Sequence, residues 1–169
     1  MLSRLVKLHI SIFYFLFINA ADILIRIITI NFIKINSSFN IIFYHEIPSE
    51  NKDNFKKQME HLNKNTTVVR PDFTGPYKKG IIYSAVTFDD AFISFYQNAI
   101  PILIEKKIPA VNFVPTKHIG KKPAWITDNT TYAYNETVMT AKQLKETASD
   151  IIEYGTHTHS HCKLPALPL

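Results

Sequence analysis

Two short clusters carry the residues of this chain that are best suited to chemistry. The run Thr87–Asp90 ends in an adjacent acid pair, and His157 and His161 stand four residues apart about 70 residues later. An acid pair at the end of an apolar strand can supply one metal ligand and one separate base. Histidine and carboxylate are the nitrogen and oxygen donors of catalytic zinc sites, which keep one position open for water. Together the clusters predict half of a metal hydrolase site.

The elements that must position these clusters follow the pattern of an α/β protein. Apolar runs predict strands over residues 40–45, 81–88, 111–114 and 151–154, and helical periodicity predicts helices over 53–64, 91–107 and 141–148. Alternating strands and helices are typical of a parallel sheet with right-handed crossovers. Both clusters then lie at the carboxyl ends of strands, where such sheets place their sites.

Successive side chains of a strand point to opposite faces, so Asp89 and Asp90 need not share a role. If Asp90 binds a divalent ion, Asp89 can stay outside the ligand set and accept a proton from water. The four-residue spacing brings His157 and His161 to one side, whether the turn is helical or nearly so. Taken alone, an acid pair is more often a helix cap or turn, and His-x-x-x-His is mostly accidental. The conjunction of both, each after a predicted strand, favours the metal site.

Residues 1–36 form a distinct segment ahead of a globular part over 37–169. Positions 8–21 are uncharged and follow Arg4 and Lys7. Fourteen residues are short for a bilayer span, which needs about 20, so three interpretations compete: a signal peptide or short anchor, an interfacial helix and a buried soluble helix. Because Asn19-Ala20-Ala21 is a poor cleavage site, we favour an uncleaved anchor or a helix lying in the membrane plane.

The formal net charge is +5, and part of it lies beside this apolar segment. That placement favours a membrane surface over nucleic acid, since no aromatic and basic interleaving occurs along the chain. The single cysteine, Cys162, excludes an intramolecular disulfide. The sequence makes no prediction of an oligomeric state.

The clusters also resemble those of a known family. Thr87-Phe88-Asp89-Asp90 looks like the first motif of the polysaccharide deacetylases, also called the NodB homology domain or carbohydrate esterase family 4. The run from His157 to His161 looks like the second motif, His-Ser/Thr-x-x-His, and the resemblance covers about residues 40–164. It implies that Asp89 is the catalytic base and that Asp90, His157 and His161 bind a divalent metal, usually zinc. The implied reaction removes N-acetyl, or occasionally O-acetyl, groups from a polysaccharide or amino-sugar glycan.

Two positions depart from the family pattern, with Ala91 where glycine is common and Cys162 where proline is frequent. The family's later motifs, which supply an arginine and a histidine general acid, have no counterpart after Leu169. The family fold is a distorted barrel of about seven strands, and only about four are visible here. We therefore expect an incomplete (β/α) barrel of the polysaccharide deacetylase type, preceded by an apolar N-terminal helix.

Three hypotheses follow for function. The first is a membrane-associated, metal-dependent deacetylase, of the cell envelope or otherwise extracytoplasmic. The second is a catalytically inactive, truncated remnant that binds metal or glycan at a membrane surface. The third is an unstable product, because half a barrel leaves a sheet edge and apolar faces uncovered.

Overall fold

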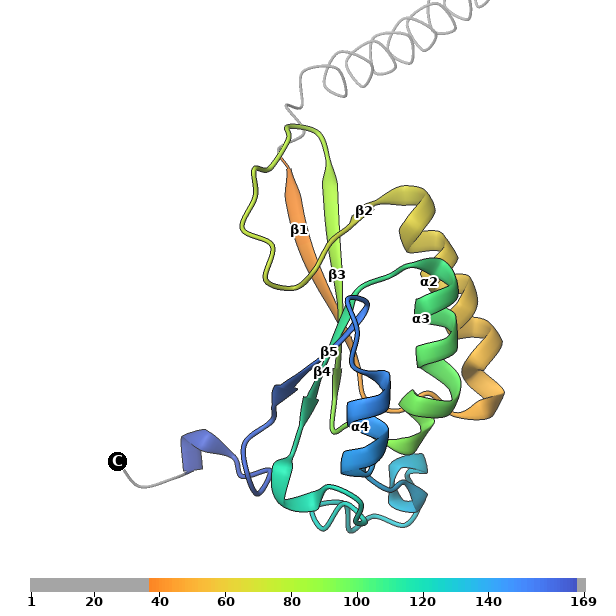
Figure 1. Ribbon diagram of the computed structural model, residues 1–169, viewed down its shortest axis with the longest axis vertical. Helices are drawn as coiled ribbons and strands as arrows, with labels where there is room; N and C mark the ends of the chain where they lie inside the picture. Colours follow the sequence, from red (N-terminus) through yellow and green to blue (C-terminus); the bar gives the residue numbers. More distant parts are fainter. Residues whose placement is uncertain (1–36, 167–169) are drawn as a thin grey trace, which may run out of the picture. The chain divides into compact units, whose positions relative to one another are not determined.

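A parallel β-sheet forms the centre of the protein. The computed structural model describes residues 37–166. The strands β1 (Ser38–Tyr44), β3 (Ile82–Asp89), β4 (Ala110–Val114) and β5 (Ile152–Thr156) lie in the order β1-β3-β4-β5, and every pairing is parallel. The predicted parallel α/β sheet is therefore confirmed (Figure 1). A two-residue strand, β2 (Thr67–Val68), was not predicted and pairs with the beginning of β3.

The register of the sheet brings the two predicted clusters to the same edge. Asp89 pairs with Phe113, and Phe113 pairs with Gly155 on the next strand. The carboxyl ends of β3, β4 and β5 therefore lie side by side, as neighbouring parallel strands must. Gly155 lets the ring of Phe113 pack directly over the backbone, because a Cβ built there would lie 2.7 Å from that ring.

The helices α2 (Lys52–Asn65), α3 (Ile100–Lys106) and α4 (Ala141–Thr147) lie on one side of the sheet in Figure 1. A π-helical segment, Phe95–Ala99, runs directly into α3. Short 3-10 turns cover Ser49–Asn51, Thr116–His118, Tyr132–Asn135 and Leu164–Ala166. Thr140 caps α4, since its hydroxyl accepts the backbone N–H of Gln143 in a capping box.

The helix predicted over 91–107 differs from the structure at its start. Ala91 and Phe92 belong to a turn and a β-bridge, and the helical backbone begins at Ile93. Pro101 is the second residue of α3, which directly follows the π-helical turn, and it has no N–H that could bond back into that turn. The wider π turn comes just before it, and such turns are frequent at functional sites.

The core lies between the sheet and these helices. Phe55 of α2, Phe88 of β3 and Phe95 are each no more than 2% exposed. Phe88 contacts both of the other rings, with centroid separations of 5.9 Å to Phe55 and 4.5 Å to Phe95. Tyr44 stacks on Phe88 from β1 at 5.4 Å. This aromatic cluster fixes the positions of β1 and β3 in the sheet. The carboxyl ends of both strands carry residues of the candidate site.

The opposite face of β1 is more exposed. Ile41 and Phe43 alternate with residues that pack on the core, and they are 53% and 65% exposed. Within residues 37–166 the other edge of β1 has no partner strand, so the sheet is open, as expected for an incomplete barrel. The apolar N-terminal helix and the boundary at residue 36 concern residues 1–36, which lie outside the described residues. No helix within residues 37–166 has the length and apolar character that a bilayer crossing requires.

Candidate metal centre

The turn after β3 presents Asp90 toward the interior. Asp90 and Ala91 both have left-handed backbone conformations, with φ of 71° and 48°. Two hydrogen bonds hold Ala91 in place. Its N–H donates to Oδ1 of Asn112 at 3.0 Å, and its carbonyl accepts the N–H of Met139 at 2.8 Å. Because Asp90 is only 3% exposed, its carboxyl is held inside the fold rather than left in solvent.

The histidine cluster lies in the loop that follows β5. The N–H of His157 donates to the carbonyl of Val114 at 2.8 Å, which ties the start of the loop to β4. Thr158 and His161 have positive φ values of 61° and 54°. The loop is therefore not helical, so the expectation of a helical or nearly helical turn is wrong, although the two histidines do lie on one side as predicted. The reversal of the chain at these two residues brings both imidazoles to the same point.

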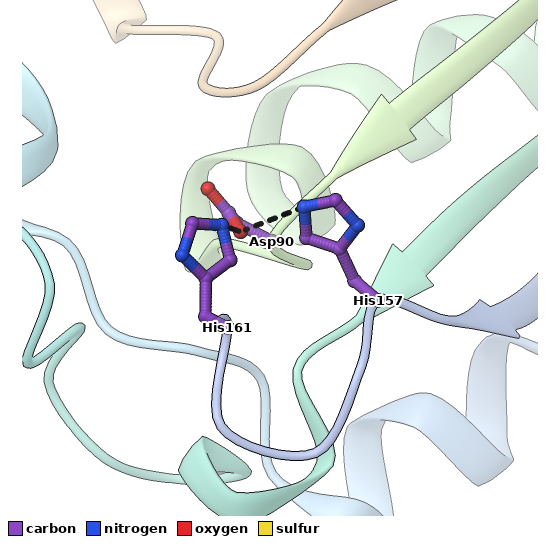
Figure 2. A group of neighbouring side chains, drawn as sticks. All are labelled: Asp90, His157 and His161. Atoms are coloured by element: carbon purple, nitrogen blue, oxygen red, sulfur yellow. Dashed lines mark ion pairs between the residues drawn. The ribbon is translucent and has the colours of Figure 1, made fainter. Parts of the chain in front are cut away.

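Asp90, His157 and His161 converge on one position, as Figure 2 shows. Nε2 of His161 lies 3.2 Å from Oδ1 of Asp90, and Nε2 of His157 lies 3.9 Å from the same oxygen. One potential ligand atom from each residue lies within 4.8 Å of the others. Donor atoms bound tetrahedrally at about 2.1 Å from zinc would lie about 3.4 Å apart, so little movement is needed to bind an ion.

The electrostatics of the cluster also fit a cation. Burial raises the pKa of Asp90 to about 6, although the nearby charges of His157 and His45 act to lower it. Oδ1 of Asp90 is buried and has no hydrogen-bond partner among the described residues. Burial lowers the pKa of His161, and the charge of His157 lowers it further. An acceptor without a donor and a histidine that favours its neutral form are suited to metal binding, which requires deprotonated ligands.

Asp89 lies beside this group without belonging to it. Its Oδ2 is 3.9 Å from Nε2 of His45, and the two side chains are 23% and 45% exposed. Sequence reasoning did not assign a role to His45. A signal was present, because Tyr44-His45 ends a strand in the same way as the acid pair ends β3. The structure thus adds a third imidazole to the edge that holds both clusters.

Two neighbouring residues of the loop, Thr158 and His159, differ in the hydrogen bonding of their side chains. His159 does not belong to the converging group, and its Nδ1 lies 3.0 Å from the hydroxyl of Thr116. The hydroxyl of Thr158 is buried and has no hydrogen-bond partner among the described residues.

Comparison with known proteins identifies the family. The sequence profile of the polysaccharide deacetylase family matches residues 75–168, which is more than half of the chain. The chain belongs to the polysaccharide deacetylase family. Its parallel sheet and the position of its two motifs at the carboxyl ends of the strands agree with this assignment.

Individual relatives give the same result. Residues of this chain are 36% identical over 75 positions to the poly-beta-1,6-N-acetyl-D-glucosamine N-deacetylase of Staphylococcus aureus (strain MSSA476), covering 44% of this chain and 23% of that protein. They are 28% identical over 141 positions to YxkH of Bacillus subtilis (strain 168), covering 75% of this chain and 44% of that protein. The chain thus spans less than half the length of these curated relatives.

Solved structures share the fold. IcaB from Ammonifex degensii is 25% identical with a TM-score of 0.58, over 73% of this chain and 55% of that one. BC0361, a polysaccharide deacetylase from Bacillus cereus, is 22% identical with a TM-score of 0.59, over 77% of this chain and 42% of that one. The fold class expected from the sequence is therefore confirmed for the described residues.

Proposed function

We propose that this chain carries the metal-binding and proton-accepting part of a hydrolase that removes N-acetyl groups from an amino-sugar polysaccharide. One observation carries the proposal: the ligand atoms of Asp90, His157 and His161 lie within 4.8 Å of one another, with the carboxyl of Asp89 on the adjacent residue. The Staphylococcus aureus relative, by its name, acts on poly-beta-1,6-N-acetyl-D-glucosamine. That polymer is accordingly the substrate that we propose to test first.

We propose zinc as the metal. One carboxylate and two imidazoles form a donor set typical of catalytic zinc, with a position left for water or substrate. A bound divalent ion supplies a Lewis acid that polarises an acyl oxygen and acidifies water. In the protein, Asp90 would hold the ion through Oδ1, and each histidine would hold it through Nε2, the atoms that already face one another.

Asp89 and His45 have complementary roles in this proposal. Asp89 accepts a proton from the attacking water, which adds its oxygen to the acetyl carbon. The carbon–nitrogen bond then breaks, and the amine nitrogen must gain a proton as acetate leaves. We propose that His45, whose Nε2 lies 3.9 Å from Oδ2 of Asp89, donates that proton. It is therefore a candidate for the general acid that the sequence alone did not provide.

The test uses the full 169-residue chain, loaded with zinc, and partially purified poly-beta-1,6-N-acetylglucosamine. Acetate release and new amines are measured together. Asp89→Asn should lower turnover by roughly 100- to 10,000-fold, the usual contribution of a general base, while leaving zinc binding intact. Asp128→Asn, at an exposed carboxylate in another loop, is the matched control. Full activity of the Asp89 variant would refute the proposed role.

This assay, together with zinc-binding and unfolding measurements, separates the two other hypotheses. If the chain binds zinc but releases no acetate, the hypothesis of an inactive remnant that binds metal is favoured over that of an enzyme. A chain that shows no cooperative unfolding would favour the unstable product. If turnover is found, His45→Gln should lower kcat more than it raises KM, because the proposed proton donor acts after substrate has bound.

We also propose that the first 36 residues attach the protein to a membrane surface on the extracytoplasmic side. The uncharged run over 8–21 and the cations Arg4 and Lys7 support this. Sedimentation of the full chain with vesicles that contain anionic lipid provides the test. Leu16→Glu should release the protein from the vesicles, and unchanged sedimentation of this variant would count against the proposal.

A further inference from the structure

The indole ring of Trp125 lies flat against the imidazole of His161. The ring centroids are 4.1 Å apart and the planes differ by 19°, which is a stacked arrangement. Two further rings hold the indole in place. Phe92 stacks nearly parallel to it at 6.4 Å, and His118 contacts it edge to face at 4.9 Å. Trp125 thus belongs to a supported aromatic cluster that ends on one of the proposed metal ligands.

The backbone around His161 does little to fix its ring. Within residues 37–166, the last backbone hydrogen bond between this loop and another segment joins it to the turn after β4. The carbonyl of His159 accepts the N–H of Lys117 at 2.8 Å. His161 follows two residues later with a φ of 54°. The torsion that rotates a histidine ring is broad and roughly two-fold, so the backbone alone leaves the direction of Nε2 open. Contact with a flat neighbour fixes the plane of the ring.

The loop that holds Trp125 is also tied to the turn that carries Asp90. The N–H of Gly120 donates to the carbonyl of Met139 at 3.0 Å. The N–H of Met139 in turn donates to the carbonyl of Ala91 at 2.8 Å, directly after Asp90. The segment carrying the indole therefore connects the histidine loop to the turn of the carboxylate ligand through hydrogen-bonded neighbours.

We propose that Trp125 is a positioning residue, which holds the His161 imidazole in the plane that directs Nε2 toward Asp90 and so strengthens divalent metal binding. The inference rests on the proposed metal centre. Groups that orient metal ligands from outside the ligand set typically change metal affinity by 10- to 100-fold when they are replaced. In this protein the orienting contact is a stacked ring, rather than the hydrogen bond that usually serves this purpose.

The first test compares zinc affinity, measured by competition with a chromophoric chelator, in the full chain and two variants. Trp125→Leu keeps apolar bulk but removes the flat ring, and it should bind zinc 10- to 100-fold more weakly. Trp125→Phe keeps a flat ring and should stay within about threefold of the original chain, since stacking is retained. Tyr134→Leu changes an exposed aromatic residue of the same segment, 40% exposed, and should bind zinc normally.

A second readout needs no substitution. Trp125 is the only tryptophan of the chain, so the indole emission reports on this stack alone. Zinc added to the unmodified protein should change the emission with the same midpoint as in the chelator competition. Zinc binding without any change in emission would overturn the inference, even if the Trp125→Leu variant failed to fold.

The outcomes separate this inference from the function on which it rests. If the unmodified chain does not bind zinc, both the metal centre and the role of Trp125 are refuted. If the chain binds zinc and Trp125→Leu binds it equally well, only the role of Trp125 is refuted. An equal loss in the Phe and Leu variants would also refute it, because a flat ring would then not be the feature that matters.

Discussion

Replacing Asp90 by asparagine should stabilise the metal-free protein while removing its response to metal. The carboxyl is buried, and its pKa is raised from an ordinary value of 3.8 to about 6. Asparagine has nearly the same shape and tolerates the left-handed conformation that residue 90 adopts. The substitution therefore removes the ionisable group with little disturbance of the backbone.

The expected size follows from the pKa shift. A difference of about 2 pKa units, at about 1.4 kcal/mol each, amounts to about 3 kcal/mol. The folded-state pKa of Asp90 is raised, so its contribution to stability is fully present below pH 3.8 and is lost as the pH rises through 6. Asp90→Asn should thus gain up to about 3 kcal/mol in free energy of unfolding at pH 7, and almost nothing near pH 3.5.

The assay is denaturant unfolding at several pH values, with a chelator present. Asp89→Asn is the matched control, because its carboxyl is 23% exposed against 4% for Asp90, and we expect a change of less than about 0.5 kcal/mol. The measurement is then repeated with zinc in place of the chelator. The original chain should gain about 2.7 kcal/mol at a zinc concentration 100 times its Kd, and Asp90→Asn should gain nothing.

Two results would refute this reasoning. If metal-free Asp90→Asn is no more stable than the original chain at pH 7, the buried carboxylate does not carry the free-energy cost that its surroundings suggest. If the gain in stability is the same at pH 3.5 and pH 7, it arises from packing or backbone conformation and not from ionisation.

Two other substitutions test the supports of the site. Glu136 is buried beside Ser94, and burial raises the pKa of its carboxyl above 4.5, so its contribution to stability falls as the pH rises. Glu136→Gln should therefore flatten the decline of the free energy of unfolding with pH. If the substitution changes that free energy equally at pH 4.5 and pH 7.5, this reasoning is wrong. Gly155→Ala should destabilise the protein by about 1 to 3 kcal/mol and weaken zinc binding, because the new methyl group meets the ring of Phe113. Adding Phe113→Leu should restore part of the stability, and strictly additive effects in thermal unfolding would rule out this contact as the cause.

The sheet could be predicted from the sequence because its strands are apolar runs with clear ends. Residues 81–88 and 151–154 were expected as strands, and β3 and β5 differ from these ranges by one or two residues at their ends. The strand β2 was missed since it has only two residues, Thr67 and Val68, and their pairing with β3 depends on the fold around them. The π-helical segment before Pro101 was missed for a similar reason, because periodicity does not distinguish it from an α-helix.

The site was predictable in its residue types but not in its geometry. The acid pair and the two histidines were proposed as site residues because few residue types bind metal and both clusters follow strands. His45 was not, because a lone histidine after a strand has no pattern of its own and becomes significant only 3.9 Å from Asp89. Trp125 was likewise hidden in a segment that the sequence marked as a loop.

Residues with strained backbone conformations gather at the candidate centre. Among residues 37–166, five residues other than glycine have positive φ, and four of them, Asp90, Ala91, Thr158 and His161, lie at the candidate centre. Each such conformation costs about 1 to 2 kcal/mol, and strained residues of this kind cluster at active sites and ligand clamps. The buried Oδ1 of Asp90 also has no hydrogen-bond partner among the described residues. A bound cation would offset the cost of burying this carboxylate, which is why we propose that the site binds a metal.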